Sequence, residues 1–246
     1  MYQFFVEPYQ INGKEIVITG TDVNHIKNVL RMKIGEELSV SNGQDGKEYR
    51  CGIVSMDEEK VKCELRFIKE DGVELSSKVY LFQGLPKADK MELIVQKMVE
   101  LGVYEIIPVA AKRCVVKLDE KKAKSKVARW QSIAEAAAKQ SKRGVIPQVR
   151  EVCSFAEAVK RASAMEVKLI PYELAEGMEK TKKLIESVKP GQNIAIFIGP
   201  EGGFEEDEVS EALAEGIEPV TLGRRILRTE TAGFTVMSWL MYQLEA

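Results

Sequence analysis

Short runs in which apolar and polar residues alternate dominate the first part of the chain. The runs span residues 15–19, 37–43, 48–56 and 60–68. They are rich in β-branched residues, and Asn-Gly and Asp-Gly pairs at 42–43 and 45–46 are turn signals, so each run predicts a β-strand. Residues 22–37 carry apolar residues at helical spacing and predict one helical turn or more. This order of elements predicts a small β-barrel that carries a helix.

From Lys78 onward, segments with helical periodicity alternate with short apolar runs. Strands are predicted at 79–84, 104–110, 166–173, 193–199 and 218–223, and helices at 90–102, 125–141, 155–162, 178–188, 205–216 and 229–246. This alternation predicts an α/β domain with a mainly parallel sheet. Residues 69–77 are polar and contain a glycine, so they form the predicted linker. The expected domains are residues 1–72 and 73–246.

The composition of the 246 residues, 45% hydrophobic and 30% charged, is that of an ordinary soluble protein. No uninterrupted apolar stretch reaches the roughly 18 residues of a membrane span. The first residues lack a basic leader before an apolar core, so we expect no secretory signal. The four cysteines have no metal-ligand spacing, and His25 is the single histidine. We therefore expect reduced thiols, a cytoplasmic protein and no metal site.

Charge is segregated along the chain although its net value is only −2. Residues 112–150 hold twelve lysines or arginines against three acids, whereas residues 199–218 hold eight acids and no base. A chain of this kind can bind a polyanion such as RNA on one face despite a slightly acidic balance. The alternative is that the basic run is only the solvated face of a helix.

The stretch FIGPEGGFEEDEV (residues 197–209) follows a predicted strand, where ligands bind in open α/β sheets. Its glycines let the backbone approach a ligand closely, and its acids fall in the first turn of the next helix, where they favour the helix dipole. A capped turn explains the acids but not Glu201 between a proline and two glycines. No nucleotide fingerprint fits. A ligand that is neutral or carries a positive centre, such as S-adenosylmethionine, suits this loop better than a pyrophosphate.

The stretch LGRRILRTETAGF (residues 222–234) follows another predicted strand. Thr229 is a good N-cap for the last helix, and Glu230 suits its first turn, so a plain capped helix accounts for both. Arg224, Arg225 and Arg228 need a further reason. Three guanidinium groups beside a helix start suit a phosphate or an anionic transition state.

Taken together, these stretches resemble the bacterial 16S rRNA uracil-N3 methyltransferases of the SPOUT superfamily. The matching stretches are HIKNVLRMKIGE (25–36), KMELIVQKMVELGV (90–103), KRCVVKL (112–118), RWQSIAEAAAKQSKRGVIP (129–147), IGPEGGFEEDEV (198–209) and LGRRILRTETA (222–232). They occur in order from near the first residues to the last helix. Three positions depart from the family pattern, which usually has Glu at Lys112 and Lys139 and commonly Gly at Lys142.

The resemblance implies a PUA-like β-barrel followed by a SPOUT-type α/β domain tied in a deep trefoil knot. It implies a homodimer, S-adenosylmethionine as the methyl donor, no metal, and uridine 1498 of 16S rRNA in the small ribosomal subunit as the substrate. The expected cofactor-binding residues are Gly199, Pro200, Glu201, Gly202, Leu222, Gly223, Leu227, Thr229, Thr231 and Ala232. Arg228 is expected to stabilise charge on the uracil, with Glu201 as base or ribose anchor. Arg31, Arg113, Gln140 and Arg143 are expected to bind RNA.

Two other functions remain open at this point. A SPOUT methyltransferase can instead act on a ribose 2′-hydroxyl. A ribosome-assembly factor without enzymatic activity would use only the barrel and the basic face, and it would have no need of the two glycine- and arginine-rich loops. Binding of S-adenosylmethionine separates an enzyme from such a factor.

Overall fold

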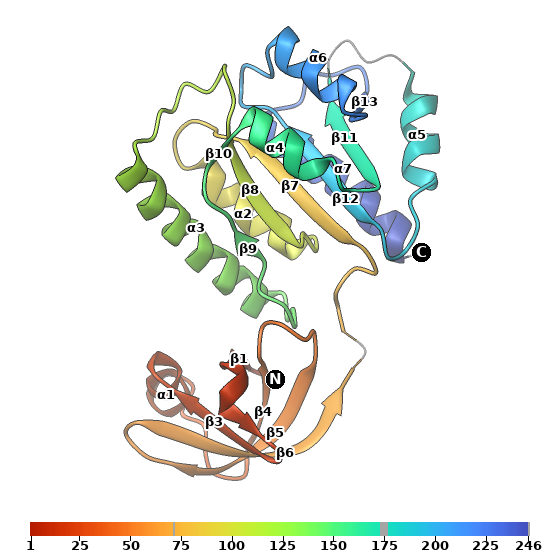
Figure 1. Cartoon of the computed structure of the whole chain (residues 1–246). Coiled ribbons are helices and arrows are strands. Elements are labelled where there is room, and N and C mark those ends of the chain that lie inside the picture. The colour runs from red at the N-terminus through yellow and green to blue at the C-terminus, as the bar shows by residue number, and fades with distance from the viewer. Residues whose placement is uncertain (71, 173–176, 246) are drawn as a thin grey trace. The chain divides into compact units, whose positions relative to one another are not determined.

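The computed structural model describes residues 1–70, 72–172 and 177–245. Residue 71 of the predicted linker, residue 173 of a predicted strand and residue 246 of the last predicted helix lie outside the described residues. The chain divides into two compact units (Figure 1). Unit 1 comprises Met1–Glu74 and Ala138–Ile146, and unit 2 comprises Leu75–Ala137 and Pro147–Ala246.

Unit 1 contains a six-stranded sheet in the order β1-β4-β5-β6-β3-β2. The strands are β1 (Gln3–Phe5), β2 (Ile11–Asn12), β3 (Glu15–Thr19), β4 (Glu37–Ser41), β5 (Glu48–Met56) and β6 (Lys60–Lys69). All pairs are antiparallel except β1 with β4. Alternate residues of β3 and β6, such as Ile16, Ile18, Val61 and Cys63, enter one hydrophobic core, which is why the alternating pattern predicted the long strands.

The helical segment of unit 1 has an unusual form. After η1 (Pro8–Gln10) and β3, α1 (Thr21–Asn24) continues into η2 (His25–Val29), a π-helical turn. Leu30 donates its N–H to the carbonyl of His25 at 2.8 Å. Arg31 follows with φ = 55°, in the left-handed region that few residues other than glycine adopt. The backbone therefore holds Arg31 in a specific conformation. It comes just after a π-helical turn, a feature that often occurs at functional positions.

Unit 2 is built on a parallel sheet in the order β10-β8-β7-β12-β11-β13, with β9 also paired to β8. Its strands are β7 (Lys78–Gly84), β8 (Glu105–Ala110), β9 (Gln148–Val149), β10 (Cys153–Ser154), β11 (Val167–Pro171), β12 (Asn193–Ile198) and β13 (Glu218–Val220). The central strands are apolar on both faces, with Leu81, Phe82, Ile196 and Phe197 fully buried. That is the pattern of a parallel sheet covered by helices.

Helices cover the sheet of unit 2. They are α2 (Lys90–Glu100), α3 (Glu120–Gln140), α4 (Phe155–Ala162), α5 (Met178–Glu186), α6 (Glu206–Ala214) and α7 (Thr229–Glu245). In Figure 1, α2 and α7 pack together behind the sheet and α4 crosses its front. The last three residues of α3 belong by their contacts to unit 1. The α/β architecture expected for this part of the chain is confirmed.

Two further features bear on the sequence-based expectations. Among the described residues, no helix is both long and apolar enough to cross a membrane. Within the same ranges, no group of three or more His, Cys, Asp or Glu side chains is arranged to hold a metal ion. Cys51, Cys63, Cys114 and Cys153 are free thiols.

Candidate active site

A cavity of about 990 Å³ lies in unit 2. Its walls are the segments that follow β11, β12 and β13, together with Arg113 after β8 and Lys90 at the start of α2. Because the strands are parallel, all of these segments emerge at the carboxyl edge of one sheet, the usual position of ligand sites in open α/β folds. The volume falls within the ~300–1,000 Å³ typical of small-molecule sites.

Close backbone packing shapes the loop after β12. A Cβ atom at Gly84 would lie 2.6 Å from Cδ of Pro200, and one at Gly199 would lie 3.0 Å from the backbone of Gly203. Neither position can hold a side chain without displacing the loop. Gly203 has a different role, because its φ of 70° is left-handed and its surroundings are open. The loop therefore folds back on itself and presents backbone to the cavity.

Thr229 ties the two loops together. Its hydroxyl donates to the carbonyl oxygen of Gly199 at 2.6 Å and accepts a hydrogen bond from the side-chain amide of Gln83 at 2.9 Å. Gln83 is fully buried, and so is most of Thr229. The first residue of α7 thus joins the ends of the two central strands, β7 and β12.

Glu201 is held by groups from the start of α2. Its carboxylate accepts a hydrogen bond from the N–H of Lys87 at 3.1 Å and lies 2.8 Å from Nζ of Lys90, which is also 3.6 Å from Glu230. Burial raises the pKa of Glu201, but the hydrogen bond and charge of Lys90, with the N–H of Lys87, outweigh it and leave that pKa below its ordinary value. The carboxylate is therefore ionised at neutral pH and is a weak base.

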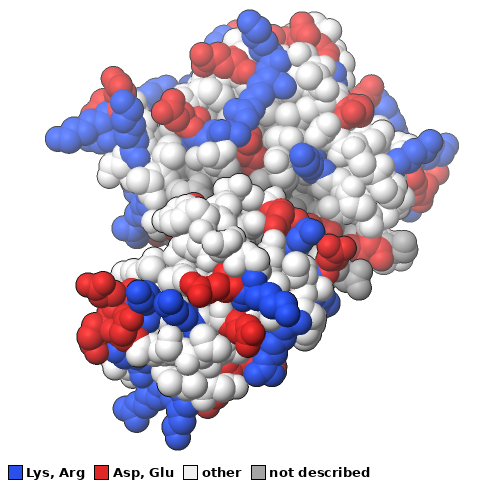
Figure 2. Space-filling view, turned by 60° about the horizontal axis from the view of Figure 1, so that its bottom comes forward, with Lys and Arg blue, Asp and Glu red and all other residues white. Residues whose placement is uncertain are grey.

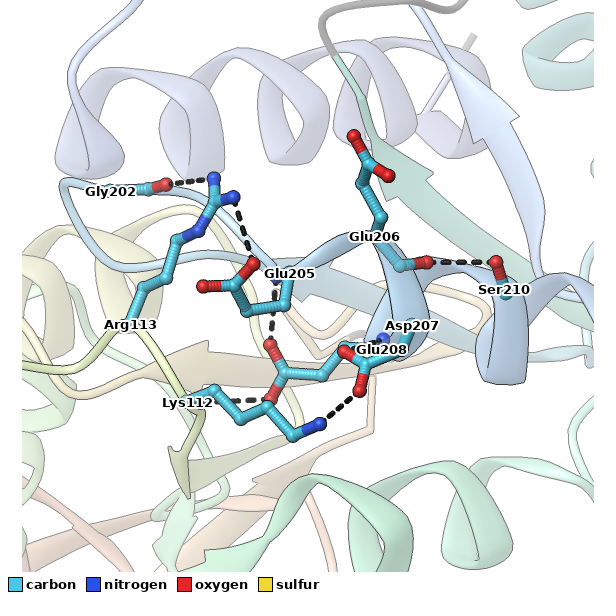
Figure 3. A network of polar contacts seen from close by, with 8 residues as sticks. All are labelled: Lys112, Arg113, Gly202, Glu205, Glu206, Asp207, Glu208 and Ser210. Atoms are coloured by element: carbon cyan, nitrogen blue, oxygen red, sulfur yellow. Dashed lines mark hydrogen bonds and ion pairs between the residues drawn. The ribbon is translucent and has the colours of Figure 1, made fainter.

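A polar network joins the loop after β8 to the start of α6 (Figure 3). Arg113 donates to the carbonyl of Gly202 at 3.0 Å and to the carboxylate of Glu205 at 2.9 Å. Lys112 pairs with Asp207 through its side chain. The hydrogen bond to Arg113 lowers the pKa of Glu205 below its ordinary value. Basic and acidic segments far apart in the sequence thus neutralise each other beside the cavity.

The loop after β13 carries cations at the cavity wall. Arg224, Arg225 and Arg228 are exposed, and within the described ranges no ion pair or hydrogen bond engages their side chains. Ile226 between them is 85% exposed. Unpaired guanidinium groups beside a cavity provide binding capacity for an anionic ligand.

Comparison with known proteins identifies the family. The profile of the RNA methyltransferase domain matches residues 73–241, and that of the RNA methyltransferase PUA domain matches residues 18–66. A Bacillus subtilis (strain 168) protein named ribosomal RNA small subunit methyltransferase E is 39% identical over 100% of this chain and 98% of its own length. The chain belongs to the ribosomal RNA small subunit methyltransferase E family.

Other similar proteins agree with this assignment. A Mesomycoplasma hyopneumoniae (strain 232) methyltransferase E is 34% identical over 97% of this chain and 98% of its own length. The crystal structure of a Neisseria gonorrhoeae methyltransferase E bound to S-adenosyl methionine superposes with a TM-score of 0.85, at 30% identity, over 98% of this chain and 97% of that one. A Legionella pneumophila protein described as a putative methyltransferase in complex with bound cofactor SAM has a TM-score of 0.84 at 32% identity, over 98% and 96%.

In this member of the methyltransferase E family, most of the expected cofactor residues line the cavity. They are Gly199, Pro200, Glu201, Gly202, Leu222, Gly223, Leu227, Thr229 and Ala232, and Arg228 joins them. Thr231 does not line the cavity and is exposed. Because each helical residue turns the chain by about 100°, Thr231 faces away from the side on which Thr229 is buried. A role for Thr231 in cofactor binding stays a prediction.

The four residues expected to bind RNA have different surroundings. Arg143 is not placed to bind RNA, because its side chain is only 4% exposed and pairs with Glu74 inside unit 1. Arg113 is engaged by Gly202 and Glu205, as described above. Gln140 and Arg31 belong to unit 1 and are exposed.

The basic segment as a whole is less cationic than its sequence indicates. Most of its lysines and arginines form ion pairs with acidic residues. The pairs that join distant parts of the sequence are Lys112–Asp207, Arg113–Glu205, Arg129–Glu92, Lys139–Asp22, Arg143–Glu74 and Arg150–Glu105. On the face drawn in Figure 2, acidic and basic side chains are interspersed. In the part of the chain that the structure describes, Lys117, Lys121, Lys126 and Lys142 have no ion pair. A continuous cationic face over residues 112–150 is therefore not formed.

Sequence reasoning did not identify three residues that shape this site. Lys90 lines the cavity and pairs with Glu201, Tyr172 follows β11 at the cavity wall, and Gly84 makes room for Pro200. The glycine at the end of β7 was a usable signal, because glycine inside a strand often marks close approach of another backbone. The sequence around Lys90 contained no comparable signal, since a lysine beside a helix start is ordinary on a protein surface.

Proposed function

We propose that this protein transfers the methyl group of S-adenosylmethionine to N3 of uridine 1498 in the 16S rRNA of the small ribosomal subunit. The observation that carries the proposal is the cavity at the carboxyl edge of the parallel sheet, walled by two loops, in a chain of this family. The loops place backbone groups on one side and unpaired arginines on the other. That combination suits a cofactor and an anionic substrate together.

The residues present fit S-adenosylmethionine. A Cβ atom at Gly199 would crowd the Gly203 backbone and one at Gly202 would crowd the Arg113 side chain, so backbone rather than side chains faces the cavity there and is proposed to bind adenine and ribose. Leu222, Gly223, Leu227 and Ala232 also line the cavity and add apolar surface to it. When bound, the cofactor supplies an electrophilic methyl group beside a sulfonium, and a carboxylate such as Glu201 tolerates that positive charge.

Arg228 is the proposed catalytic residue. Loss of the N3 proton spreads negative charge over O2 and O4 of the uracil, and a nearby guanidinium stabilises that charge as it grows. The edge of the base that carries N3 takes part in pairing, so the base must be single-stranded or unstacked to react. Arg228 is exposed at the cavity wall without an acid partner among the described residues, which leaves its charge available.

Glu201 is proposed as an anchor for the cofactor ribose. The sequence left this role and that of a general base open. Its lowered pKa and its bonds to Lys90 and the N–H of Lys87 support the anchor, since a base that accepts the N3 proton needs a higher pKa. A carboxylate held on two sides also has a fixed direction, which suits hydrogen bonding to ribose hydroxyls.

For RNA binding, we propose the loop arginines Arg224 and Arg225, with Arg31 and Gln140 from unit 1. The loop arginines are exposed and have no acid partner among the described residues. They line the cavity in which the target uracil must meet the methyl group of the cofactor. The π-turn and left-handed backbone at Arg31 support a specific role for that side chain.

We also propose that the α/β domain is knotted, that the domains divide at residues 72 and 73, and that the protein is a cytoplasmic homodimer. The knot and the dimer rest on family membership, the domain boundary on the change of sequence pattern after the polar linker, and the cytoplasmic location on the expected reduced thiols. The dimer has added support from unit 2, where Tyr242 of α7 is 78% exposed and Leu93 of α2 is 43% exposed. Light scattering at micromolar concentration tests it, and a single 27.6 kDa species would exclude the dimer.

The proposed reaction is tested on small subunits from a strain that lacks the protein. Purified protein and S-adenosylmethionine should add one methyl group to the fragment containing uridine 1498. Nucleoside analysis after complete digestion should find the methyl group on uracil N3. A methyl group on ribose would support the 2′-hydroxyl alternative, and binding of the subunit without any cofactor heat in calorimetry would support an assembly factor. Naked 16S rRNA run in parallel shows whether the assembled subunit is required.

A further inference from the structure

Arg113 stands on a rigid segment. Its neighbours Ala111 and Cys114 are buried, and the backbone N–H of Lys112 donates to Glu208 at 2.9 Å. Glu208 is only 3% exposed, and its other carboxylate oxygen accepts the N–H of Glu205 at 3.0 Å. One buried carboxylate therefore fixes the backbone beside Arg113 to the start of α6.

From this base, the side chain of Arg113 reaches the loop after β12 at two points. Its guanidinium donates to the carbonyl of Gly202 and to the carboxylate of Glu205, and its stem lies so close that a Cβ atom at Gly202 would be 3.3 Å from the Cβ of Arg113. The Arg113 side chain thus lies against Gly202 and donates to its carbonyl (Figure 3). A fixed fork of donors suits this task, because each bond defines the position of the other.

We propose that Arg113 is a positioning residue for the cofactor loop. It holds the Gly202 peptide and the N-terminus of α6 in the conformation that binds S-adenosylmethionine, an inference that rests on the proposed function. The sequence had suggested RNA phosphate as its partner. The structure favours the loop, because the guanidinium already has a carbonyl and a carboxylate partner and lines the cavity itself.

The two roles predict different results for Arg113→Ala. A positioning residue predicts that the dissociation constant for S-adenosylmethionine, measured by calorimetry, rises about tenfold or more, as expected for loss of a charge-assisted hydrogen bond. It also predicts a higher KM for the cofactor, with kcat largely retained at saturating cofactor. Arg113→Lys should recover part of the affinity, because a lysine keeps the charge without the fork.

Lys112→Ala is the matched control. It removes a neighbouring basic side chain that pairs with Asp207 but keeps the N–H bonded to Glu208. Its cofactor affinity should stay within about twofold of wild type. Glu205→Gln combined with Arg113→Ala should cost less than the sum of the single changes, because both residues belong to one contact.

The proposal is overturned if Arg113→Ala binds the cofactor like wild type while its RNA affinity and the salt dependence of RNA binding fall. It is also overturned if Lys112→Ala weakens cofactor binding as much as Arg113→Ala, which would show a general charge effect. Failure of the proposed function has a separate signature, since the wild-type protein would then bind no S-adenosylmethionine. If Arg113→Ala does not fold, Arg113→Lys and Glu205→Gln give the same readouts with smaller perturbation.

Discussion

Thr229 donates its hydroxyl hydrogen to the carbonyl oxygen of Gly199, at 2.6 Å, and thereby closes the cavity wall across 30 residues of sequence. Thr229→Val keeps the shape but removes the hydrogen bond to the Gly199 carbonyl and one of the two hydrogen bonds of the Gln83 amide, which still donates to the Gly84 carbonyl at 3.0 Å. Buried groups left in this way cost about 1–3 kcal/mol, so a thermal melt should show a fall of several degrees. Thr229→Ser retains the hydroxyl and should melt close to wild type. Equal melting of the valine variant and wild type would show that the hydrogen bond has no role in stability.

Arg228→Ala should lower kcat by ~10²-fold or more, the scale for removing one preorganised donor to a transition state. Binding of S-adenosylmethionine should change little, because the effect belongs mainly to the transition state. Arg228→Lys should recover only part of the rate. Single-turnover methylation and a thermal melt on the same samples decide the matter. A normal single-turnover rate with a lowered melting temperature would assign Arg228 a structural role.

The ion pair of Glu201 and Lys90 predicts a pH dependence. The pKa of Glu201 in the folded protein lies below its ordinary value of 4.5. The ionised Glu201 carboxylate therefore stabilises the fold fully above pH 4.5, and this contribution is lost as the pH falls through the lowered pKa. Lys90→Gln removes the charge that lowers this pKa, whereas burial continues to raise it. Cofactor affinity of the variant should therefore begin to fall at a higher pH than that of wild type. Calorimetry between pH 4 and 8 measures the shift, and superimposable profiles would refute the anchoring role of Glu201.

Lys142, in the turn that follows α3, has a left-handed conformation with φ = 60°. Its N–H bonds the carbonyl of Lys139 at 3.3 Å and that of Arg143 bonds Ala138 at 3.0 Å, a pairing that usually has glycine at this position. Lys142→Gly should raise stability by about 0.5 kcal/mol, because relief of the steric cost exceeds the entropy of glycine. The midpoint of urea unfolding should rise, whereas Ser141→Gly in the same turn should lower it. A lower midpoint for Lys142→Gly would contradict the steric account.

Arg224→Ala with Arg225→Ala should weaken RNA binding and reduce the slope of log affinity against log salt by about one for each phosphate that the protein no longer neutralises. The contrasting variant is Arg143→Ala. Its guanidinium is buried against Glu74, so this change should destabilise the protein and leave the salt slope of the folded fraction unchanged. A reduced slope for Arg143→Ala alone would place RNA at the segment that ends α3.

Periodicity predicted the long elements well, because burial on one face of a strand or helix is written directly into alternating or helical spacing. Its failures are specific. β2, β9 and β10 have only two residues each, too few to show a pattern. The helix predicted from residue 125 begins at Glu120, since its first turns are lysine-rich and solvated and so carry no apolar spacing.

The cavity walls were predictable for a different reason. Loops after parallel strands meet at one edge, so the glycines and arginines at 199–203 and 222–228 could be expected to lie together. Arg143 could not be assigned in the same way, because its partner Glu74 is 69 residues away and no local pattern pairs them. The same holds for Lys139 and Asp22, which are 117 residues apart. Sequence shows which charges exist, but only the fold shows which remain unpaired.

The glycines around the cavity also define where this enzyme can change over evolution. Gly84 and Gly199 are fixed by lack of space, since the backbone of Pro200 or Gly203 occupies the position of a side chain. Gly203 is fixed only by its backbone conformation, which asparagine also tolerates. Substitutions should therefore accumulate at Gly203 among functional variants and be purged at Gly84 and Gly199. A glycine that is invariant among functional variants therefore indicates that a neighbouring backbone excludes any side chain. A position that accepts both glycine and asparagine indicates only a left-handed turn.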